Sequence, residues 1–176
     1  LNATEESQIV ILMIDSERGF EKQDANIANI IEYEGKPFVI AVNKWDLVKN
    51  KKEKKKEIEE KIEEFLPQVG KISIAYISAQ KNQGIDKLMQ LSERLDKICD
   101  RRLTTSELNE FLIQISNKHP HPNKNGRPVK IKYITQPKVR PSHFIIFSNY
   151  PNYIKESYKR YLINEIRKEF DFDGVP

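Results

Sequence analysis

The chain has 176 residues, enough for one large domain or two small ones. Hydrophobic residues make up 38% of it and charged residues 32%, a balance that excludes both a disordered chain and a membrane-embedded one. The longest apolar run, Ile9–Ile14, is far shorter than the roughly 20 residues that cross a bilayer, so we expect no membrane partner. The single cysteine, Cys99, excludes an internal disulfide, which favours a reducing cytoplasmic location.

Charge divides the sequence into an acidic and a basic part. Residues 1–100 hold 16 Lys and Arg against 19 Asp and Glu, a net charge of −3. Residues 101–176 hold 14 against 7, a net charge of +7. This asymmetry predicts two domains, 1–100 and 101–176, of which the second faces an anionic partner. A modestly basic surface without such a partner is the plainer alternative.

Short apolar runs alternate with helical patterns in residues 1–100. Three runs predict strands that are buried on both faces: Ile9–Ile14, Pro37–Val42 and Lys71–Ile77. Apolar residues at helical spacing predict three helices: Asp24–Glu34, Glu53–Leu66 and Ile85–Ile98. Residues 1–7 resemble the end of a further helix. The alternation predicts an α/β fold, with a parallel sheet covered by helices on both faces.

The pattern changes after residue 100. A capping box of Thr104 and Glu107 predicts the start of a helix. A loop is expected next, followed by two paired strands and a long helix: His119–Pro128, Val129–Thr135, His143–Phe147 and Tyr153–Phe170. The order helix–strand–strand–helix predicts a small α/β domain that stops before a further strand. Both ends of the chain resemble cuts through a longer protein.

The tetrad Asn43-Lys44-Trp45-Asp46 follows the second predicted strand, at the end where ligands bind in open α/β sheets. The Asp46 carboxylate can accept hydrogen bonds from both N1–H and the 2-amino group of guanine, a pair of donors that adenine lacks. Asn43 can tie neighbouring loops together, and the methylene stem of Lys44 can cover one face of the base. For Trp45, packing beside the loop and contact with the ligand are equally open.

A second loop supports the same interpretation. Ser78-Ala79-Gln80 follows the next predicted strand, also at its carboxyl end. There the backbone N–H of Ala79 could donate to guanine O6, and the small side chain lets the backbone come close. Two such loops after consecutive strands predict a site for one purine.

The two loops resemble the base-recognition motifs of translation-factor-related GTPases, and the whole chain resembles the Der (EngA) family. That family consists of bacterial GTPases with two tandem G domains followed by a KH-like domain. The segments that carry the resemblance are VILMIDSERGFEKQD, VIAVNKWDLV, TTSELN, HPHP, VKIKYITQPKVRPSHFIIFSN and SYKRYLINEIRKEF. The resemblance implies the later half of the second G domain, part of a P-loop NTPase sheet, and then a KH-like domain without its last strand.

The resemblance also implies a function. The intact protein would bind GTP or GDP with Mg²⁺, hydrolyse GTP and assist assembly of the large ribosomal subunit in the cytoplasm. Its KH-like domain would dock on the G domains first and contact rRNA second. Two other classes remain open: a KH-type RNA-binding module with a degenerate G-domain scaffold, and an interaction protein without a ligand.

Two parts of the GTPase pattern are missing. The sequence has no G-x-x-x-x-G-K-[ST] loop to cradle phosphates, and residues 1–100 have no Asp-x-x-Gly segment to order Mg²⁺ and the attacking water. Phosphoryl transfer depends on positioning and electrostatic stabilisation of the phosphates. We therefore predict no catalytic or metal-binding residue, no GTP hydrolysis and no tightly bound cofactor in this chain. Base contacts alone would leave a dissociation constant of about 1 mM.

Three further candidates have two interpretations each. Asp15 could bind metal or phosphate, but capping of the next turn is the favoured role. His119 and His121 could hold a metal, but without a third ligand at metal-site spacing they are expected to end the preceding helix. The basic residues of 101–176 could bind RNA, yet the Gly-x-x-Gly loop of KH domains does not occur.

Overall fold

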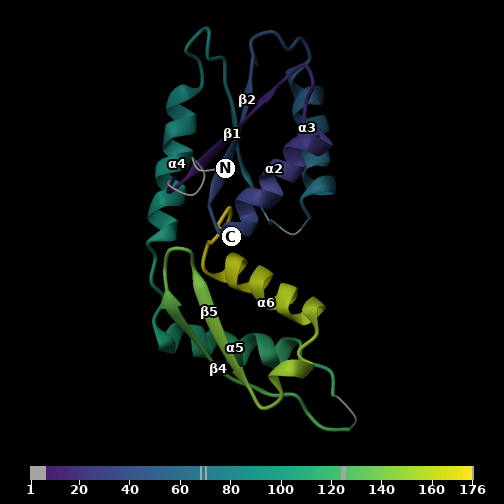
Figure 1. The fold of residues 1–176 in the computed structure, drawn as a ribbon, viewed down its shortest axis with the longest axis vertical. Helices are drawn as coiled ribbons and strands as arrows, with labels where there is room; N and C mark the ends of the chain where they lie inside the picture. The colour runs from purple at the N-terminus through teal and green to yellow at the C-terminus, as the bar shows by residue number, and fades with distance from the viewer. Residues whose placement is uncertain (1–6, 68, 70, 124–125, 176) are drawn as a thin grey trace. The chain divides into compact units, whose positions relative to one another are not determined.

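The fold is seen in a computed structural model that describes residues 7–67, 69, 71–123 and 126–175 (Figure 1). Contacts divide the chain into two compact units. Unit 1 comprises Leu1–Cys99 with Asp173–Pro176, and unit 2 comprises Asp100–Phe172. The helix end expected in residues 1–7 lies, apart from Ser7, outside the described residues.

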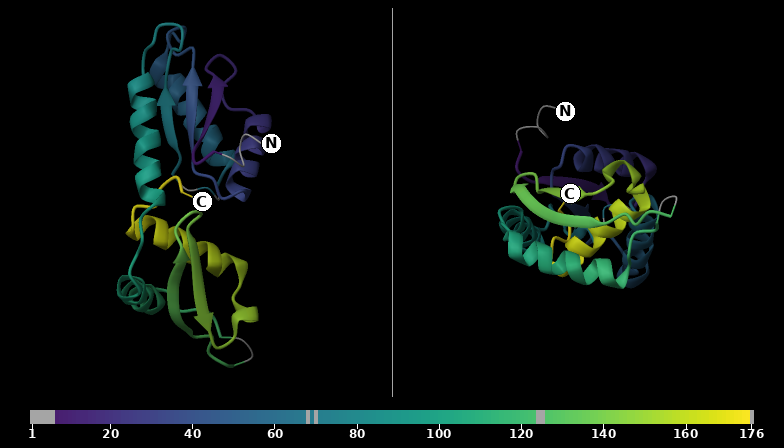
Figure 2. Two further views of the ribbon diagram at one scale, coloured as in Figure 1. Left: turned by 60° about the vertical axis from the view of Figure 1, so that its left-hand side comes forward. Right: turned by 90° about the horizontal axis from the view of Figure 1, so that it is seen from below.

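Unit 1 is built on a parallel sheet in the order β1–β2–β3. Its strands are β1 (Val10–Asp15), β2 (Phe38–Asn43) and β3 (Ser73–Tyr76). The register places the last residues of β1 and β2, Asp15 and Asn43, beside each other. The carboxyl ends of the strands therefore meet at one edge of the sheet (Figure 2). The predicted α/β class is confirmed.

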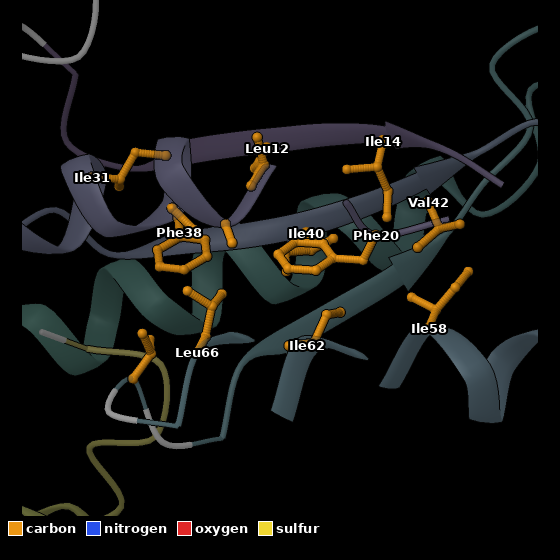
Figure 3. Packing of buried hydrophobic residues seen from close by; sticks show 13 residues of the cluster. Leu12, Ile14, Phe20, Ile31, Phe38, Ile40, Val42, Ile58, Ile62 and Leu66 are labelled. Atoms are coloured by element: carbon orange, nitrogen blue, oxygen red, sulfur yellow. The ribbon is translucent and has the colours of Figure 1, made fainter. Parts of the chain in front are cut away.

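Helices cover both faces of this sheet. On one face, α2 (Lys22–Tyr33) and α3 (Lys51–Phe65) enclose the main core, where side chains of β1 and β2 meet those of the two helices (Figure 3). Phe38, Ile40 and Val42 of β2 all lie in this layer and are at most 1% exposed. On the other face, α4 (Ile85–Cys99) packs on β2 and β3, and Cys99 is a buried free thiol.

Burial on both faces holds for β2 but is wrong for β1. The β2 residues Val39 and Ala41, which point away from the main core, are 0% exposed. In β1, by contrast, Ile11 is 42% exposed and Met13 is 53% exposed. The reason is that α4 packs on β2 and β3, whereas β1 has its helical cover on the side of α2.

The charged helix α3 begins earlier than its apolar stripe predicts. Asn50 caps it by accepting a hydrogen bond from the N–H of Glu53 at 3.3 Å, so the helix includes the lysines that precede the stripe. Ion pairs one turn apart, such as Lys56–Glu60, line the solvent side. The lysine-rich run is thus the start of an amphipathic helix.

Unit 2 consists of two long helices and a hairpin. It contains α5 (Thr105–Lys118), β4 (Ile131–Lys138), β5 (His143–Ser148), a short 3₁₀ helix η1 (Pro151–Tyr153) and α6 (Glu156–Glu169). The predicted capping box is present, since Thr104 Oγ1 accepts from Glu107 N–H at 3.3 Å and Glu107 Oε2 accepts from Thr104 N–H at 2.8 Å. The strands β4 and β5 pair with each other, as expected, and run antiparallel.

The single helix predicted over Tyr153–Phe170 is wrong at its start. Pro151 begins the separate η1, and the chain is extended at Ile154 and Lys155 before α6 begins. The apolar residues before Glu156 have helical spacing in the sequence, but they lie outside α6.

One face of the hairpin packs on α5 and the other is open. Ile134 of β4 is 1% exposed and lies on the α5 side, where β4 contacts the helix. On the opposite face Tyr133 is 40% exposed and Phe147 is 48% exposed, with their ring centroids 5.5 Å apart.

The two histidines lie where α5 ends, as expected. His119 is the C-cap residue of α5, and His121 is 8% exposed, edge-on to the ring of Tyr158. In the part of the chain that the structure describes, no group of His, Cys, Asp and Glu could hold a metal ion. A helix long and apolar enough to cross a bilayer is likewise missing from the described residues.

Candidate nucleotide site

The tetrad Asn43–Asp46 begins at the last residue of β2 and continues into the loop beyond it. Hydrogen bonds join this loop to the chain that leaves β3. Ile77 N–H donates to Val42 O at 2.8 Å, and Trp45 N–H donates to Ile77 O at 2.9 Å. The loop of Ser78–Gln80 is closed in turn by a backbone bridge between Ser78 and Gln83. The structure therefore brings together the two loops that the sequence singled out.

Asn43 joins the loops through its side chain. Its Oδ1 accepts the N–H of Ala79 at 3.0 Å. The N–H expected to donate to guanine O6 is thus bonded to Asn43 in this structure, and the sequence interpretation missed that competition. A purine bound here would have to share or replace this contact.

The Asp46 carboxylate is surrounded by donors. Its side chain is only 8% exposed, and Oδ2 forms an ion pair with Lys81 Nζ at 3.1 Å. A hydrogen bond from the hydroxyl of the buried Ser78, together with that of Lys81, holds the pKa of Asp46 below its usual range. The carboxylate is therefore charged at neutral pH and oriented before any ligand arrives.

Lys44 has a backbone conformation that residues other than glycine rarely adopt. Its φ is 61°, in the left-handed region. Its ammonium forms an ion pair with Asp15 at 2.7 Å, and this contact raises the pKa of Lys44. Asp15 also accepts the N–H of Glu17 at 2.8 Å, which is the predicted turn capping. The ion pair with Lys44 is a second role that sequence reasoning missed.

Trp45 and Gln80 differ in their surroundings. The ring of Trp45 packs beside the main core, with its centroid 4.3 Å from that of Tyr76. Packing is therefore the role that this structure gives Trp45. Gln80 is exposed at the end of the second loop. Lys81, one residue further on, was not singled out from the sequence, although a basic residue directly after the loop was a usable signal.

Comparisons with known proteins show the families that the two parts of the chain resemble. The family described as "Elongation factor Tu GTP binding domain" matches residues 1–98, more than half of the chain. The chain belongs to this family of GTP-binding domains. A second family, described as "KH-domain-like of EngA bacterial GTPase enzymes, C-terminal", matches residues 102–176.

Relatives over the full chain confirm the resemblance to the Der family. A protein of Ruegeria pomeroyi named GTPase Der is 38% identical over 176 residues, which are 100% of this chain and 36% of that protein. One of Bartonella tribocorum with the same name is 41% identical over 100% of this chain and 37% of its own length. The chain therefore spans little more than a third of the relatives it matches.

Two solved structures are similar more weakly. A variant of Aquifex aeolicus Era bound to GDP and AlF4⁻ is 20% identical, with a TM-score of 0.46 over 97% of this chain and 62% of that one. Translation elongation factor SelB of Methanococcus maripaludis is 19% identical, with a TM-score of 0.47 over 57% of this chain and 21% of that one.

Proposed function

We propose that the loops Asn43–Asp46 and Ser78–Gln80 recognise the guanine base of a nucleotide. The observation that carries this proposal is the Asp46 carboxylate, which is charged, nearly buried and held at the edge of the sheet by Ser78 and Lys81. Guanine offers two adjacent donors to such a group. Adenine offers neither donor, so it would gain none of the hydrogen bonds that guanine makes with this carboxylate.

The residues present suit the base end of GTP or GDP. The sequence supplies neither a P-loop nor an Asp-x-x-Gly segment in residues 1–100. We accordingly propose base recognition, and not phosphoryl transfer, as the role of residues 1–100. In this proposal residues 1–100 recognise the guanine base of the nucleotide, and residues 101–176 form a KH-like domain.

A wider role is proposed for the intact protein. Because full-chain relatives are named GTPase Der, we propose that the chain serves in a cytoplasmic, GTP-hydrolysing factor that uses Mg²⁺ and assists assembly of the large ribosomal subunit. In that setting the KH-like domain would dock on the G domains.

An Asp46→Asn variant tests base recognition. Asparagine keeps one acceptor for N1–H but turns the second acceptor into a donor, which suits the 2-oxo group of xanthine instead of the 2-amino group of guanine. We expect guanosine binding to weaken and xanthosine binding to strengthen, measured by NMR titration. An unchanged preference for guanosine would reject the proposal.

One observation favours contact with RNA as a second candidate function. From Phe111 to Lys155 the sequence contains eight Lys and Arg but no Asp or Glu. The exposed aromatic pair of Tyr133 and Phe147 lies on a strand face within this stretch. A segment that combines cationic side chains with exposed rings suits a single-stranded nucleic acid, whose phosphates pair with cations and whose bases stack on rings.

A binding series with a fluorescent single-stranded RNA tests this candidate. Affinity should fall linearly in a plot of log K against log salt, and Phe147→Ala should weaken it severalfold. Tyr33→Ala removes a ring that is 89% exposed in unit 1 and should change nothing. Equal loss in both variants, or no salt dependence, would remove RNA contact by this face.

A further inference from the structure

The turn after β1 contacts the loop Asn43–Asp46 at three points. Asp15 and Ser16 lie at the end of β1, beside the end of β2. Ser16 N–H donates to Asn43 O at 2.9 Å, and Ser16 Oγ donates to Lys44 O at 3.0 Å. The third point is the ion pair of Asp15 with Lys44 at 2.7 Å. Backbone and side chain of Lys44 are thus both tied to the same dipeptide.

Ser16 is suited to hold the unusual backbone of Lys44. The serine is 0% exposed, so its hydroxyl has no access to water and the carbonyl of Lys44 is a partner that satisfies it. A left-handed φ of 61° persists at a lysine only when its surroundings favour it. The two hydrogen bonds from Ser16, on either side of that φ, supply this support.

Asp15 is suited to hold the ammonium. One carboxylate oxygen is occupied by the N–H of Glu17, which fixes the carboxylate in the turn, and the other faces Lys44. Lysine has a long flexible side chain, so a stem that is to cover a base has to be ordered first. An anchored carboxylate at the far end of the stem does this before the base arrives.

We propose that Asp15 and Ser16 are positioning residues that set Lys44 for guanine binding. This inference rests on the proposed function, because it assumes that a base lies against Lys44. In this role Asp15 does more than cap a turn. The contact lowers the pKa of Asp15, and the pair is partly exposed, with side-chain exposures of 27% for Asp15 and 51% for Lys44.

Guanosine is the probe, because it needs no phosphate contacts. NMR titrations of the 176-residue chain compare wild type with Asp15→Asn, which removes the charge with little change in shape. Glu17→Gln is the matched control, since it removes an exposed charge from the same turn and leaves the contacts of Asp15 in place. We expect Asp15→Asn to weaken guanosine binding at least fivefold and Glu17→Gln to change it less than twofold.

A double-mutant cycle separates positioning from a general loss of structure. Lys44→Met keeps most of the stem but removes the ammonium that Asp15 holds. If Asp15 acts through Lys44, adding Asp15→Asn to Lys44→Met should weaken guanosine binding less than twofold further. Fully additive losses would overturn the inference. Ser16→Ala should weaken binding even at high salt, where the ion pair is screened.

The outcomes distinguish the two proposals. If wild-type chain binds guanosine no better than adenosine, the proposed function fails. If wild type is selective and Asp15→Asn binds equally well, only the positioning role fails. Should Asp15→Asn not fold, Asp15→Glu replaces it, because it keeps the charge but moves it by one methylene. Weaker guanosine binding by that variant supports positioning, and wild-type binding overturns it.

Discussion

Each charged side chain of the tetrad Asn43–Asp46 forms an ion pair with a residue outside the tetrad. Lys44 lies against Asp15 and Asp46 lies against Lys81. A weakly exposed carboxylate such as Asp46 needs donors in order to stay charged, and Lys81 and Ser78 provide them. The site is therefore ordered by its own residues, and a guanine base would add donors to a carboxylate that is already oriented.

Asn43→Ala tests the side-chain tie between the two loops. Removing Oδ1 leaves the Ala79 N–H without the acceptor that it has at 3.0 Å, a contact worth about 0.5–1.5 kcal/mol. Hydrogen exchange at the Ala79 amide should accelerate by roughly threefold to tenfold. Asn152→Ala, at an exposed position of η1, serves as the control. Unchanged exchange at Ala79 would show that Asn43 does not hold the second loop.

The titration of Asp46 gives a pH prediction. Its pKa is lowered in the folded chain, so the stabilisation from its contacts is fully present above the unfolded pKa of about 3.9 and is lost as the pH falls through the lower folded value. Because Asp46 does not change its protonation between about pH 7 and pH 5, its titration should not change guanosine affinity in that range. A carboxyl carbon titration by NMR checks this, and a midpoint above about 4 contradicts it.

At the scale of residues, the sequence placed the proposed site residues in two loops but did not show which side chains hold them. Asn43, Asp46 and Ala79 were predictable because motif spacing and strand ends place them together. The ion pairs of Lys44 and Asp46 were not, because they depend on strand register and on side-chain rotamers. For the same reason the ion pair of Asp15 with Lys44 was not predicted, although capping of the next turn by Asp15 was.

Among the elements, the second loop depends on a glycine. Gly84 follows the Ser78–Gln83 bridge at the start of α4 and has a φ of +75°. A Cβ there would lie 2.4 Å from the backbone oxygen of Tyr76 in β3. The close approach of α4 to β3, and with it the closure of the loop, therefore requires glycine at this position.

Gly84→Ala should lower the free energy of unfolding, and Gly126→Ala is its matched control. Gly126 has nearly the same φ of +74°, but an added methyl group would meet nothing within 4 Å, so the alanine carries the backbone strain without the clash. We expect a loss of about 1 kcal/mol for Gly126→Ala and at least about 2 kcal/mol more for Gly84→Ala. Urea unfolding measures both. Equal losses would mean that α4 moves aside freely.

Strands and helices were predictable where apolar periodicity reflects burial. The continuous apolar runs predicted three parallel strands, and the run Val129–Thr135 predicted β4. Periodicity could not reveal that Ile11 and Met13 are exposed, because it reports residue type and not which helices cover a sheet. It also could not locate the break before α6, which depends on the turn at Pro151.

For the molecule as a whole, the composition of the site predicts binding without turnover. Positioning and electrostatic stabilisation of the phosphates supply most of the catalysis in phosphoryl transfer, and the chain has neither the P-loop nor the Asp-x-x-Gly segment in residues 1–100. Purified chain incubated with GTP and Mg²⁺ should release phosphate no faster than buffer. Release above buffer that disappears in Asp46→Asn would contradict this.

Both family matches and the division into units describe a chain with two parts. Residues 1–98 match a GTP-binding domain and residues 102–176 match the KH-like domain of EngA GTPases. The charge asymmetry of the sequence follows the same division. Base recognition by the first part and binding of an anionic partner by the second are therefore separate proposals. Each can be tested independently of the other.

The most direct test of guanine recognition is a comparison of guanosine with adenosine on the wild-type chain, followed at the backbone amides of Lys44, Asp46 and Ala79. Base contacts alone predict saturable shifts with guanosine at a dissociation constant of about 1 mM, and binding of adenosine at least about tenfold weaker. Equal shifts with both nucleosides, or none with guanosine, would contradict the account.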